Sequence, residues 1–428
     1  MPFRIALSGL DAASTDLQVT GHNIANSATN GFKQSRAEFA DIYATSIQDV
    51  SATASGRGVR VTRVAQQFSQ GNINFTASNL DLALNGEGFF TLQDAAGNVS
   101  YTRAGAHTVD RDGYVVNHAN DRLQVFAPIG TSTTNFNTGS TVDLQLPTLS
   151  GAPSATSAAT VAVNLDASST ATPAATLFDP TVATSYDSST STTVYDSLGS
   201  AHTMTMYYRE SDTVANQWHV YTTVDGNIVT PTTNSTAAPS SAAYPSATVN
   251  FSTSGALTTG SGSVSASGTI AYNALPITGA AALNLTFDYN NTTQFGSAFA
   301  VNNLTQDGYA TGRLSGVDID NSGVVFARFT NGQSTGLGKV ALAKFNNPQG
   351  LRQLGDTSWG ETFTSGSVQM GEAGTSSFGL IQSGGLENSN VDIAEQLVNL
   401  ITAQRNFQAN AQVITTADTV TQTIINIR

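Results

Sequence analysis

The amino-acid sequence predicts a multidomain, mainly β protein with a long α-helix at each end and nested, discontinuous domains. Apolar residues recur at steps of three and four near both ends of the chain, as they do on one face of a helix. Short alternating segments separated by Asn-Gly and Asp-Gly pairs follow from about residue 80, and this pattern is typical of antiparallel strands. The composition becomes rich in Ser, Thr and Ala between about residues 146 and 290, after which the earlier β pattern returns. This return predicts that one β domain is inserted into another.

The two terminal stripes predict two long helices that pack against other helices. The C-terminal stripe lacks Gly and Pro, and its mean step of about 3.4 residues is close to the 3.5 of a supercoiled helix pair. A helix at one end of a chain can also pack on the core of its own domain, and this alternative stays open. The N-terminal stripe comprises Phe3, Ala6, Leu10, Ala13, Leu17, Thr20 and Ile24. The C-terminal stripe comprises Ile393, Leu397, Leu400, Gln404, Phe407, Ala411, Ile414, Ala417, Val420, Ile424 and Ile427.

The helix boundaries carry their own signals. Gly31 is placed for a left-handed residue after the first helix. The segment Ser389-Asn390-Val391-Asp392 has the spacing of a capping box before the last helix. Residues 34–50 show a weaker helical pattern through Phe39, Ile42, Tyr43 and Ile47, and a strand pattern begins at Val59.

The β regions are bounded by turn residues. We expect hairpin turns at Gly86-Glu87-Gly88, at Ala96-Gly97-Asn98 and at Asp112-Gly113. Segments 323–329 and 337–345 predict strands that complete the sheet begun near Leu80. The Ser/Thr/Ala-rich region predicts an all-β insert.

Composition excludes several classes of function. The formal net charge is −13 and only 11% of the residues are charged, so no basic surface is available for nucleic acid or an anionic membrane. Cysteine is absent, which excludes disulfides and thiolate sites. No apolar run is long enough for a membrane span. The N-terminus has no long apolar region with a cleavage signal, so we expect no cleaved secretory leader.

The sequence offers no constellation of catalytic, cofactor-binding or metal-binding residues. The five histidines lack zinc-ligand spacing, and neither a nucleophile elbow nor a P-loop is present. Asp318, Asp320 and Asn321 could suggest a calcium loop, but their spacing favours a simple Asx turn. We therefore expect no enzymatic activity.

Neighbouring copies of the chain could cover what the two terminal helices leave exposed on each other. A lone helix pair covers only one side of each stripe, while burial of a Leu, Ile or Phe contributes roughly 1.5–3 kcal/mol. Contacts between different patches of identical subunits build an open helical filament unless the rotation closes. The stripes therefore predict a self-assembling subunit.

Three segments resemble the family of bacterial flagellar rod and hook axial proteins. Residues 23–33, Asn-Ile-Ala-Asn-Ser-Ala-Thr-Asn-Gly-Phe-Lys, are similar to its N-terminal signature. Residues 385–392 with 395–398 and 403–411 are similar to its C-terminal signature, and residues 82–90 to a segment of its first β domain. The insert and residues 193–199 resemble the hook branch of the family. The motif residues that carry over are Asn23, Asn26, Gly31, Phe32, Asn390, Val391, Asp392, Gln404 and Arg405.

The resemblance implies a structural subunit of the flagellar hook, a curved tubular polymer that acts as a flexible joint transmitting motor torque from rod to filament. Its partners would be further copies of itself, the distal rod and hook–filament junction proteins, the hook cap and the flagellar type III export apparatus. It would lie outside the cell without a cleaved leader, use no cofactor, and neither bind nucleic acid nor insert into a membrane. The residues expected at the self-assembly interface are Phe3, Leu10, Leu17, Ile24, Ile393, Leu397, Leu400, Phe407, Ile414, Val420, Ile424 and Ile427.

The resemblance also implies four domains. A terminal coiled-coil domain would comprise residues 1–32 and 390–428, and a connecting segment residues 33–70 and 383–389. An inner β domain would comprise residues 71–145 and 291–382, and an outer one residues 146–290.

Two alternative functions stay open from the sequence. One is a distal-rod subunit, which would form a straight shaft. The other is a secreted carbohydrate-binding or hydrolytic β protein, suggested by Tyr207, Tyr208 and Trp218 together with the carboxylates of the insert.

Overall fold

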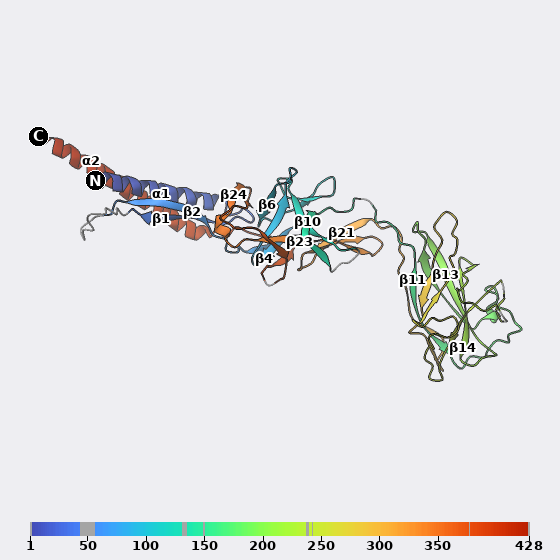
Figure 1. Cartoon of the computed structure of the whole chain (residues 1–428). Coiled ribbons are helices and arrows are strands. Elements are labelled where there is room, and N and C mark those ends of the chain that lie inside the picture. Colours follow the sequence, from blue (N-terminus) through green and yellow to red (C-terminus); the bar gives the residue numbers. More distant parts are fainter. Residues whose placement is uncertain are drawn as a thin grey trace. The chain divides into compact units, whose positions relative to one another are not determined.

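The computed structural model divides the chain into two compact units (Figure 1). It describes residues 2–42, 56–130, 135–148, 150–236, 239–241, 243–375 and 377–426. Unit 1 comprises Met1–Thr148, Ser315–Arg328 and Ser334–Arg428, whereas unit 2 comprises Leu149–Leu314 and Phe329–Gln333. The fold is mainly β with one long helix near each end of the chain, as the sequence predicts.

The two long helices belong to unit 1 and lie side by side (Figure 1). Helix α1 spans Pro2–Ala25 and helix α2 spans Ile393–Asn426. Both confirm the helices predicted from the apolar stripes, and α1 extends one residue beyond its stripe at each end. The β1–β2 pair also packs on α1.

The predicted helical pattern of residues 34–50 is wrong for its described part. Residues Ser35–Asp41 form strand β1, which pairs antiparallel with β2 (Val59–Gln66). Ala37 is buried while its neighbours are partly or fully exposed, so the segment alternates like a strand. Pairing with β2 satisfies the backbone groups and overrides a weak local preference for helix. Tyr43 and Ile47 lie outside the described residues.

The largest sheet of unit 1 combines strands from both halves of the chain. Its path runs β21-β22-β23-β9-β5-β6-β25-β24, with β7, β8, β10 and β26 attached beside it. Strand β23 (Ser334–Lys344) pairs with both β5 and β9, which confirms that the later segment completes the earlier sheet. The other strands of this sheet are β5 (Phe89–Gln93), β6 (Val99–Thr102), β7 (Thr108–Val109), β8 (Val115–Val116), β9 (Arg122–Pro128), β10 (Phe136–Asp143), β21 (Leu314–Ile319), β22 (Val324–Phe329), β24 (Arg352–Gly355), β25 (Ser358–Gly360) and β26 (Gln369–Glu372).

Two of the three expected hairpin turns are present. The β5–β6 pair turns through Gly97, and the β7–β8 pair turns through Asp112-Gly113. The expected turn at Gly86-Glu87-Gly88 does not form a hairpin, because β4 (Leu82–Asn85) pairs with β27 (Leu380–Ser383) instead of β5. Nearby, β3 (Ile73–Phe75) pairs with β28 (Gly385–Glu387). These two pairs bring the start and the end of the unit 1 β region together.

Unit 2 contains two five-stranded sheets, and in its described residues the only helical element is the short η1 (Ala183–Ser185). One sheet holds β11 (Ala158–Asp166), β17 (Thr269–Ala271), β18 (Thr286–Asp288), β19 (Thr293–Phe295) and β20 (Ala300–Gln306). The other holds β12 (Ser188–Tyr195), β13 (Ala201–Glu210), β14 (Gln217–Val224), β15 (Asn227–Ile228) and β16 (Ala247–Asn250).

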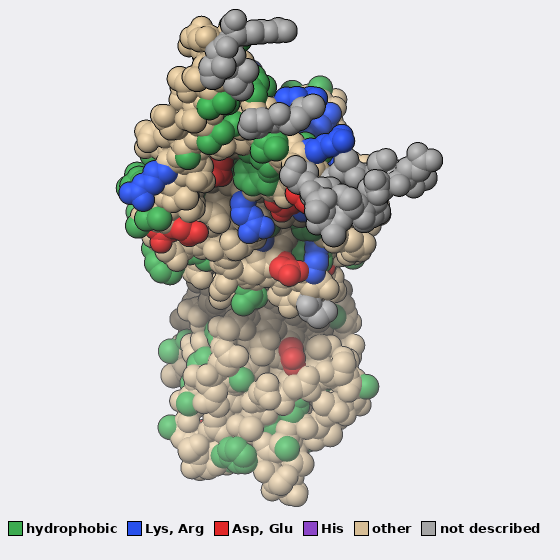
Figure 2. Space-filling model, turned by 90° about the vertical axis from the view of Figure 1, so that its left-hand side faces the viewer, with side chains coloured by type: hydrophobic (Ala, Val, Ile, Leu, Met, Phe, Trp, Pro, Cys, Tyr) green, Lys and Arg blue, Asp and Glu red, His purple; other side chains and the backbone are tan. Residues whose placement is uncertain are grey.

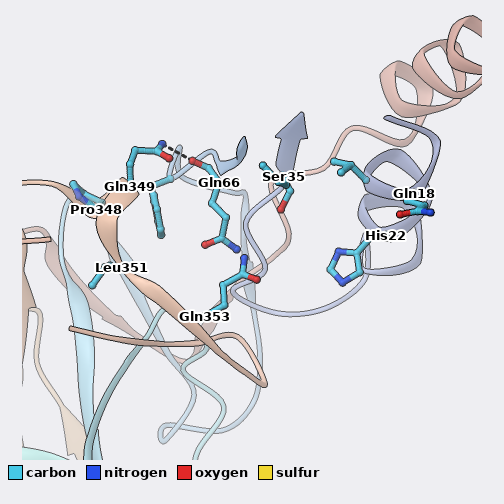
Figure 3. Close-up of a pocket in the computed structure, with 11 residues that line it drawn as sticks. Gln18, His22, Ser35, Gln66, Pro348, Gln349, Leu351 and Gln353 are labelled. Atoms are coloured by element: carbon cyan, nitrogen blue, oxygen red, sulfur yellow. Dashed lines mark hydrogen bonds between the residues drawn. The ribbon is translucent and has the colours of Figure 1, made fainter. Parts of the chain in front are cut away.

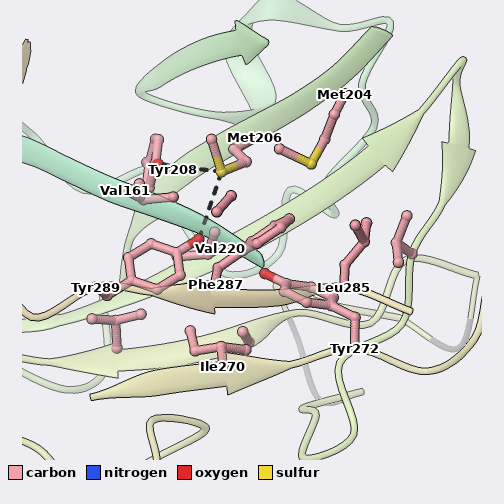
Figure 4. Close-up of a cluster of buried hydrophobic side chains, with 14 of the residues drawn as sticks. Val161, Met204, Met206, Tyr208, Val220, Ile270, Tyr272, Leu285, Phe287 and Tyr289 are labelled. Atoms are coloured by element: carbon pink, nitrogen blue, oxygen red, sulfur yellow. Dashed lines mark hydrogen bonds between the residues drawn. The ribbon is translucent and has the colours of Figure 1, made fainter. Parts of the chain in front are cut away.

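The core of unit 2 takes side chains from both of its sheets (Figure 4). Val161 and Phe287 come from one sheet, and Met204, Met206 and Val220 from the other. The hydroxyls of Tyr208 and Tyr289 both donate to the sulfur of Met206, at 3.8 and 3.7 Å. The alternation of Met204 and Met206 with threonines therefore separates the buried from the more exposed face of β13, as predicted for an all-β insert.

The end of the inserted domain lies later than the predicted residue 290. Strands β19 and β20 follow this residue but pair with β11, so residues 291–314 belong to unit 2. Long-range pairing with β11 decides their membership, and no local signal in residues 291–314 reveals it. The remaining boundaries of the four-domain division stay a prediction.

Few charged side chains are visible in the space-filling view (Figure 2). Uncharged polar side chains and backbone atoms cover most of this face, in keeping with a chain that is only 11% charged. No described helix is both long and apolar enough to cross a membrane.

Two buried histidines predict a loss of stability in acid. Burial lowers the pKa of His107 and of His219 to about 4. Because both folded pKa values lie below the ordinary 6.5, the unfolded chain takes up protons first as the pH falls. Each histidine should therefore reduce the free energy of unfolding of its own unit by roughly 3 kcal/mol as the pH falls from about 6.5 to 4.

Thermal unfolding at about pH 7 and pH 5, together with NMR titration of the ring signals, would check this expectation. His202 serves as the internal control, because hydrogen bonding to Asp225 raises its pKa. A His107 or His219 ring that protonates before the His202 ring would contradict the prediction.

Candidate functional site: the helix pair and its junction

Helices α1 and α2 run antiparallel and approach each other closely. A Cβ atom added at Gly9 would lie 2.5 Å from Oδ1 of Asn410, and the side chain of Asn23 donates to Oε1 of Gln396 at 3.1 Å. Residue numbers thus rise along α1 as they fall along α2. The most buried side chains of the two helices are small or polar: Ala6, Ala12, Ala13, Thr20, Asn23, Gln396 and Ala403. Small side chains allow the two backbones to come close together.

The residues expected at a self-assembly interface divide into two groups. Leu10, Leu17, Ile24, Leu400, Phe407 and Ile414 are half-buried. Phe3, Ile393, Leu397 and Val420 are exposed. The side chain of Ile424 and the whole of Ile427 lie outside the described residues. The predicted stripes therefore differ from the contact between α1 and α2. Some of their side chains are partly covered, and others face solvent.

Helix α2 exposes large apolar side chains along much of its length. Its exposed large apolar side chains are Ile393, Leu397, Val398, Ile401, Val413, Val420 and Ile425. Helix α1 adds exposed apolar residues in its first turns: Phe3, Ile5 and Leu7. We call these residues the open helix face. Val398, Ile401, Val413 and Ile425 lie outside the predicted stripe, although Val398 and Ile401 are visible in the sequence as a second apolar row.

The predicted capping box would place Ser389 at the N-cap of α2. In the structure Asp392 is the N-cap. Oδ1 of Asp392 accepts hydrogen bonds from the backbone N–H groups of Ala394 and Glu395, at 2.8 and 3.3 Å. The Ser389 hydroxyl accepts from the backbone N–H of the half-buried Val391 instead, at 3.3 Å. The carboxylate satisfies free N–H groups and stabilises the positive end of the helix dipole.

Two asparagine side chains join the helix ends to the connecting strands. Asn23 bonds both backbone groups of Ser35, through Oδ1 at 2.8 Å and Nδ2 at 2.7 Å. Asn390 accepts from the backbone N–H of Gln34 at 2.7 Å and donates to the carbonyl of Gln67 at 2.8 Å. Each amide uses its donor and its acceptor together, because an Asn side chain carries both an NH2 group and a carbonyl oxygen. Both residues belong to the motifs that the sequence analysis singled out.

The other motif residues contribute unequally to this junction. Phe32 is buried, and its ring centroid lies 5.5 Å from that of His22. Asn26 donates to the carbonyl of His22 at 2.9 Å and so closes the end of α1. Gln404 and Arg405 are exposed on α2.

A buried cluster of three charged side chains lies at the centre of the junction. Nζ of Lys33 lies 2.6 Å from Oε1 of Glu387, and Nη1 of Arg103 lies 3.3 Å from Oε2 of the same carboxylate. The Lys33 and Glu387 side chains are 0% exposed and that of Arg103 is 6% exposed. The cluster joins the segment after α1, the segment after β6 and strand β28, which precedes α2 by a few residues.

Backbone groups complete this cluster. Lys33 also donates to the carbonyl of Ser69 at 2.7 Å, and the N–H of Gly71 donates to Oε1 of Glu387 at 2.8 Å. Arg103 donates to the carbonyl of Gly86 at 2.8 Å. Desolvation on burial lowers the pKa of Lys33 and of Arg103, and the charge of Glu387 opposes this shift. The negative charge of Glu387 therefore offsets the cost of burying the two cations in the folded state.

Sequence reasoning missed the role of these three residues. Lys33 and Glu387 belong to the motif segments, but they are 354 residues apart, and no local pattern pairs them. The available signal was a charged residue in each motif of a chain that carries few charges.

A cavity of about 390 Å³ lies beside the junction (Figure 3). It is lined by Gln18 and His22 of α1, by Gln66 of β2, and by Gln349 of η2 (Pro348–Gly350) and Gln353 of β24. The side chain of Gln349 donates to the carbonyl of Gln66 at 2.5 Å (Figure 3). Glutamines share this lining with apolar side chains such as Val64, Phe68 and Leu351, and the cavity offers no set of groups suited to catalysis.

The described residues that the sequence suggested for metal or sugar binding make other contacts. Among the described residues, no group of three or more His, Asp or Glu side chains could hold a metal ion. Asp320 forms an Asx turn, accepting from the N–H groups of Ser322 and Val324 at 2.9 Å each, as expected. Tyr208 and Trp218 are buried in the core of unit 2, and Tyr207 packs on Phe178. Tyr208 and Trp218 are therefore not available to stack on a sugar, which removes two of the three rings that suggested carbohydrate binding.

Three family models of flagellar axial proteins match successive parts of this chain, two in its β region and one over its C-terminal helix. Residues 83–164 match the flagellar hook protein FlgE/F/G D1 domain, and residues 164–309 match the flagellar basal body protein FlaE D2 domain. Residues 382–427 match the flagellar basal body rod FlgEFG protein C-terminal model.

Full-length relatives identify the family within that class. The flagellar hook protein FlgE of Salmonella typhimurium and that of Escherichia coli strain K12 are each 37% identical to this chain, over 100% of both chains. The chain therefore belongs to the flagellar hook protein family, and it is a hook subunit. The crystal structure of Helicobacter pylori flagellar hook protein FlgE2 matches with a TM-score of 0.51 and 14% identity, over 72% of this chain and 99% of that one, and supports the fold.

Removal of the central carboxylate should destabilise unit 1 strongly. Glu387→Gln keeps the side-chain shape but leaves Lys33 and Arg103 buried without their counter-charge. We expect the free energy of unfolding of unit 1 to fall by about 3–5 kcal/mol. The matched control is Glu87→Gln, because Glu87 pairs with Lys344 while 74% of its side chain is exposed, so its loss should cost less than about 1 kcal/mol. Equal effects in urea unfolding would refute the role of the cluster.

Substitution of Gly31 should also weaken the junction. Gly31 has a φ of +71°, and an added Cβ would lie 2.4 Å from the backbone nitrogen of Ala104. Gly31→Ala should therefore cost at least about 3 kcal/mol, since a steric clash adds to the left-handed backbone strain. Gly130 has a φ of +65° with nothing within 4 Å of the added Cβ, so Gly130→Ala should cost only about 1–2 kcal/mol. The comparison of the two melting curves isolates the close approach.

Proposed function

We propose that this hook subunit self-assembles into a curved tubular polymer that serves as a flexible joint, transmitting motor torque from the rod to the filament. In this polymer the terminal helices form an inner coiled-coil layer, and the β domains form outer layers. Residues 33–70 and 383–389 connect the helices to the β domains. The subunit acts as a structural element without catalysis.

The open helix face is the observation that carries this proposal. Helix α2 is held to α1 by one side only, so Leu397, Val398 and Ile401 stay in contact with water in the isolated chain. Burial of each such side chain contributes roughly 1.5–3 kcal/mol, and large exposed apolar surfaces mark interaction sites. A second copy of the same helix pair supplies an apolar surface of matching chemistry.

The rigid junction supports the same function. A subunit that transmits torque needs a firm connection between its contact surface and its body. Asn23 and Asn390 tie the helix pair to the strands of unit 1 by partly buried hydrogen bonds, and the Lys33–Glu387–Arg103 cluster does so by buried ion pairs. Force on the helices therefore passes to the β region without a flexible linker at this point.

The family also suggests the partners and the location. Relatives of the same length from several bacteria are named flagellar hook protein. We propose that the ends of the polymer contact distal rod and hook–filament junction proteins, and that a hook cap assists assembly. Export by the flagellar type III apparatus, without a cleaved leader, would bring the subunit outside the cell.

A charge on the open helix face should block assembly without unfolding the subunit. The side chain of Val398 is 62% exposed, so Val398→Asp should change the melting temperature little. In the polymer the same carboxylate would be buried, and we expect the critical concentration to rise at least about tenfold, since 1.4 kcal/mol corresponds to that factor. Sedimentation and electron microscopy of the purified chain would measure it.

The matched control is Val214→Asp in unit 2. This valine is 48% exposed but lies outside the helices, so the same chemical change should leave the critical concentration within about twofold of the wild-type value. Unchanged tube formation by Val398→Asp would count against the open helix face as the assembly surface.

A further inference from the structure

Two segments of unit 2 run antiparallel where the chain passes into and out of this unit. We call residues 150–157 and 306–313 the connector ribbon. The N–H of Gly151 donates to the carbonyl of Gly312 at 2.7 Å. Ser154 and Tyr309 exchange backbone hydrogen bonds in both directions, at 3.0 and 2.9 Å. A two-stranded ribbon of this length is marginally stable by itself, so what packs against it decides how firmly it is held.

A tight turn between β12 and β13 lies against both segments of this ribbon. We call residues 195–200 the clasp turn. Gly199 has a φ of +82°, and an added Cβ would lie 2.8 Å from Cβ of Pro153 and 3.2 Å from the nitrogen of Thr311. Pro153 and Thr311 belong to different segments of the ribbon. The turn therefore touches both of them at one point, where only glycine leaves enough space.

Hydrogen bonds fasten the clasp turn to the ribbon. Tyr195 and Thr156 are joined twice, through the carbonyl of Tyr195 at 2.9 Å and the hydroxyl of Thr156 at 2.9 Å. The same hydroxyl donates to Oε1 of Gln306 at 2.8 Å, on the other segment of the ribbon. Thr156 is buried, so this chain of bonds is protected from water.

The shape of the clasp turn depends on one buried carboxylate. Oδ1 of Asp196 accepts from the backbone N–H groups of Leu198 and Ser200, at 2.9 and 2.8 Å. Its other oxygen, Oδ2, lies 3.4 Å from Nε2 of His202. Nδ1 of His202 lies 2.6 Å from Oδ2 of Asp225, in the turn between β14 and β15. Asp196 and Asp225 are the charged groups that face His202 in the described part of the chain.

The imidazole can bond both carboxylates only when it is protonated. A neutral ring has a single N–H, so one of the two carboxylates would face a nitrogen lone pair. Loss of the proton therefore breaks one of the two hydrogen bonds and leaves either Asp196 or Asp225 without its bond to the ring. We propose that the clasp turn and His202 form a proton-dependent clamp that holds the connector ribbon together, so that the protonation of His202 sets how firmly the chain is fixed where it passes into and out of unit 2.

The sign of the pH dependence follows from the pKa values of these groups. Hydrogen bonding to Asp225 raises the pKa of His202 above its ordinary 6.5. A group with a raised folded pKa stabilises fully below its unfolded pKa, and this contribution is lost as the pH rises through the folded pKa. The clamp is therefore closed in mild acid and loosens in base. It acts in the free subunit and does not depend on self-assembly.

Hydrogen exchange of the full-length, unassembled chain tests this proposal. The measured amides are Gly151, Ser154 and Tyr309, corrected for intrinsic exchange, near pH 6 and near pH 9. In the wild-type chain their protection should fall by about tenfold across this range, beyond any change in the β13–β14 amides. His202→Gln should show the low protection at both pH values, because a neutral amide side chain cannot replace the imidazolium between two carboxylates.

Gly199→Ala and Leu198→Ala provide the second variant and the matched control. Gly199→Ala should lower ribbon protection at both pH values through its clash with Pro153 and Thr311. The side chain of Leu198 is 62% exposed in the same turn, so Leu198→Ala should behave as wild type. Ribbon protection that is equal in the wild type and His202→Gln near pH 6, or a wild-type protection that does not change with pH, would overturn the proposal.

Discussion

The ion cluster of Lys33, Arg103 and Glu387 is the interaction on which the arrangement of unit 1 depends. It places one carboxylate between two cations in a buried region, and its three members come from the segment after α1, the segment after β6 and the strand before α2. A buried ion pair contributes little stability compared with apolar packing, but removal of one partner is strongly unfavourable. The cluster therefore mainly selects one arrangement of the three segments, since only that arrangement pairs all three charges.

This constraint explains how the helix pair is fixed to the strands of unit 1. Small residues bring α1 and α2 close together, and the amides of Asn23 and Asn390 continue the contact into the connecting strands. The polar junction fixes the helices, which leaves their apolar surface free for another role. An apolar face that is not needed for the fold of the subunit is available for contacts between copies of the hook subunit.

Unit 2 is built on a different principle. Its core is a continuous apolar cluster between two sheets, with tyrosine hydroxyls directed to the sulfur of Met206. Polar networks occupy its margins, where the clasp turn meets the connector ribbon. Because the apolar core is separate from the polar contacts between the clasp turn and the connector ribbon, these contacts can respond to pH while the core of the unit remains folded.

The sequence by itself determined the elements whose signals are local. Apolar periodicity predicted α1 and α2, and the turns at Gly97 and Asp112-Gly113 predicted their hairpins, because helices and tight hairpins are made from contacts between near neighbours. It also determined the family, through motifs that turn out to contain Asn23, Asn390 and Glu387. Tertiary structure alone decided that residues 35–41 form a strand, that β4 pairs with β27, that residues 291–314 belong to unit 2, and that Lys33 meets Glu387 across 354 positions. Each of these depends on a partner far away in the chain. No local pattern specifies which distant segment pairs with a strand edge or supplies the counter-charge of a buried ion.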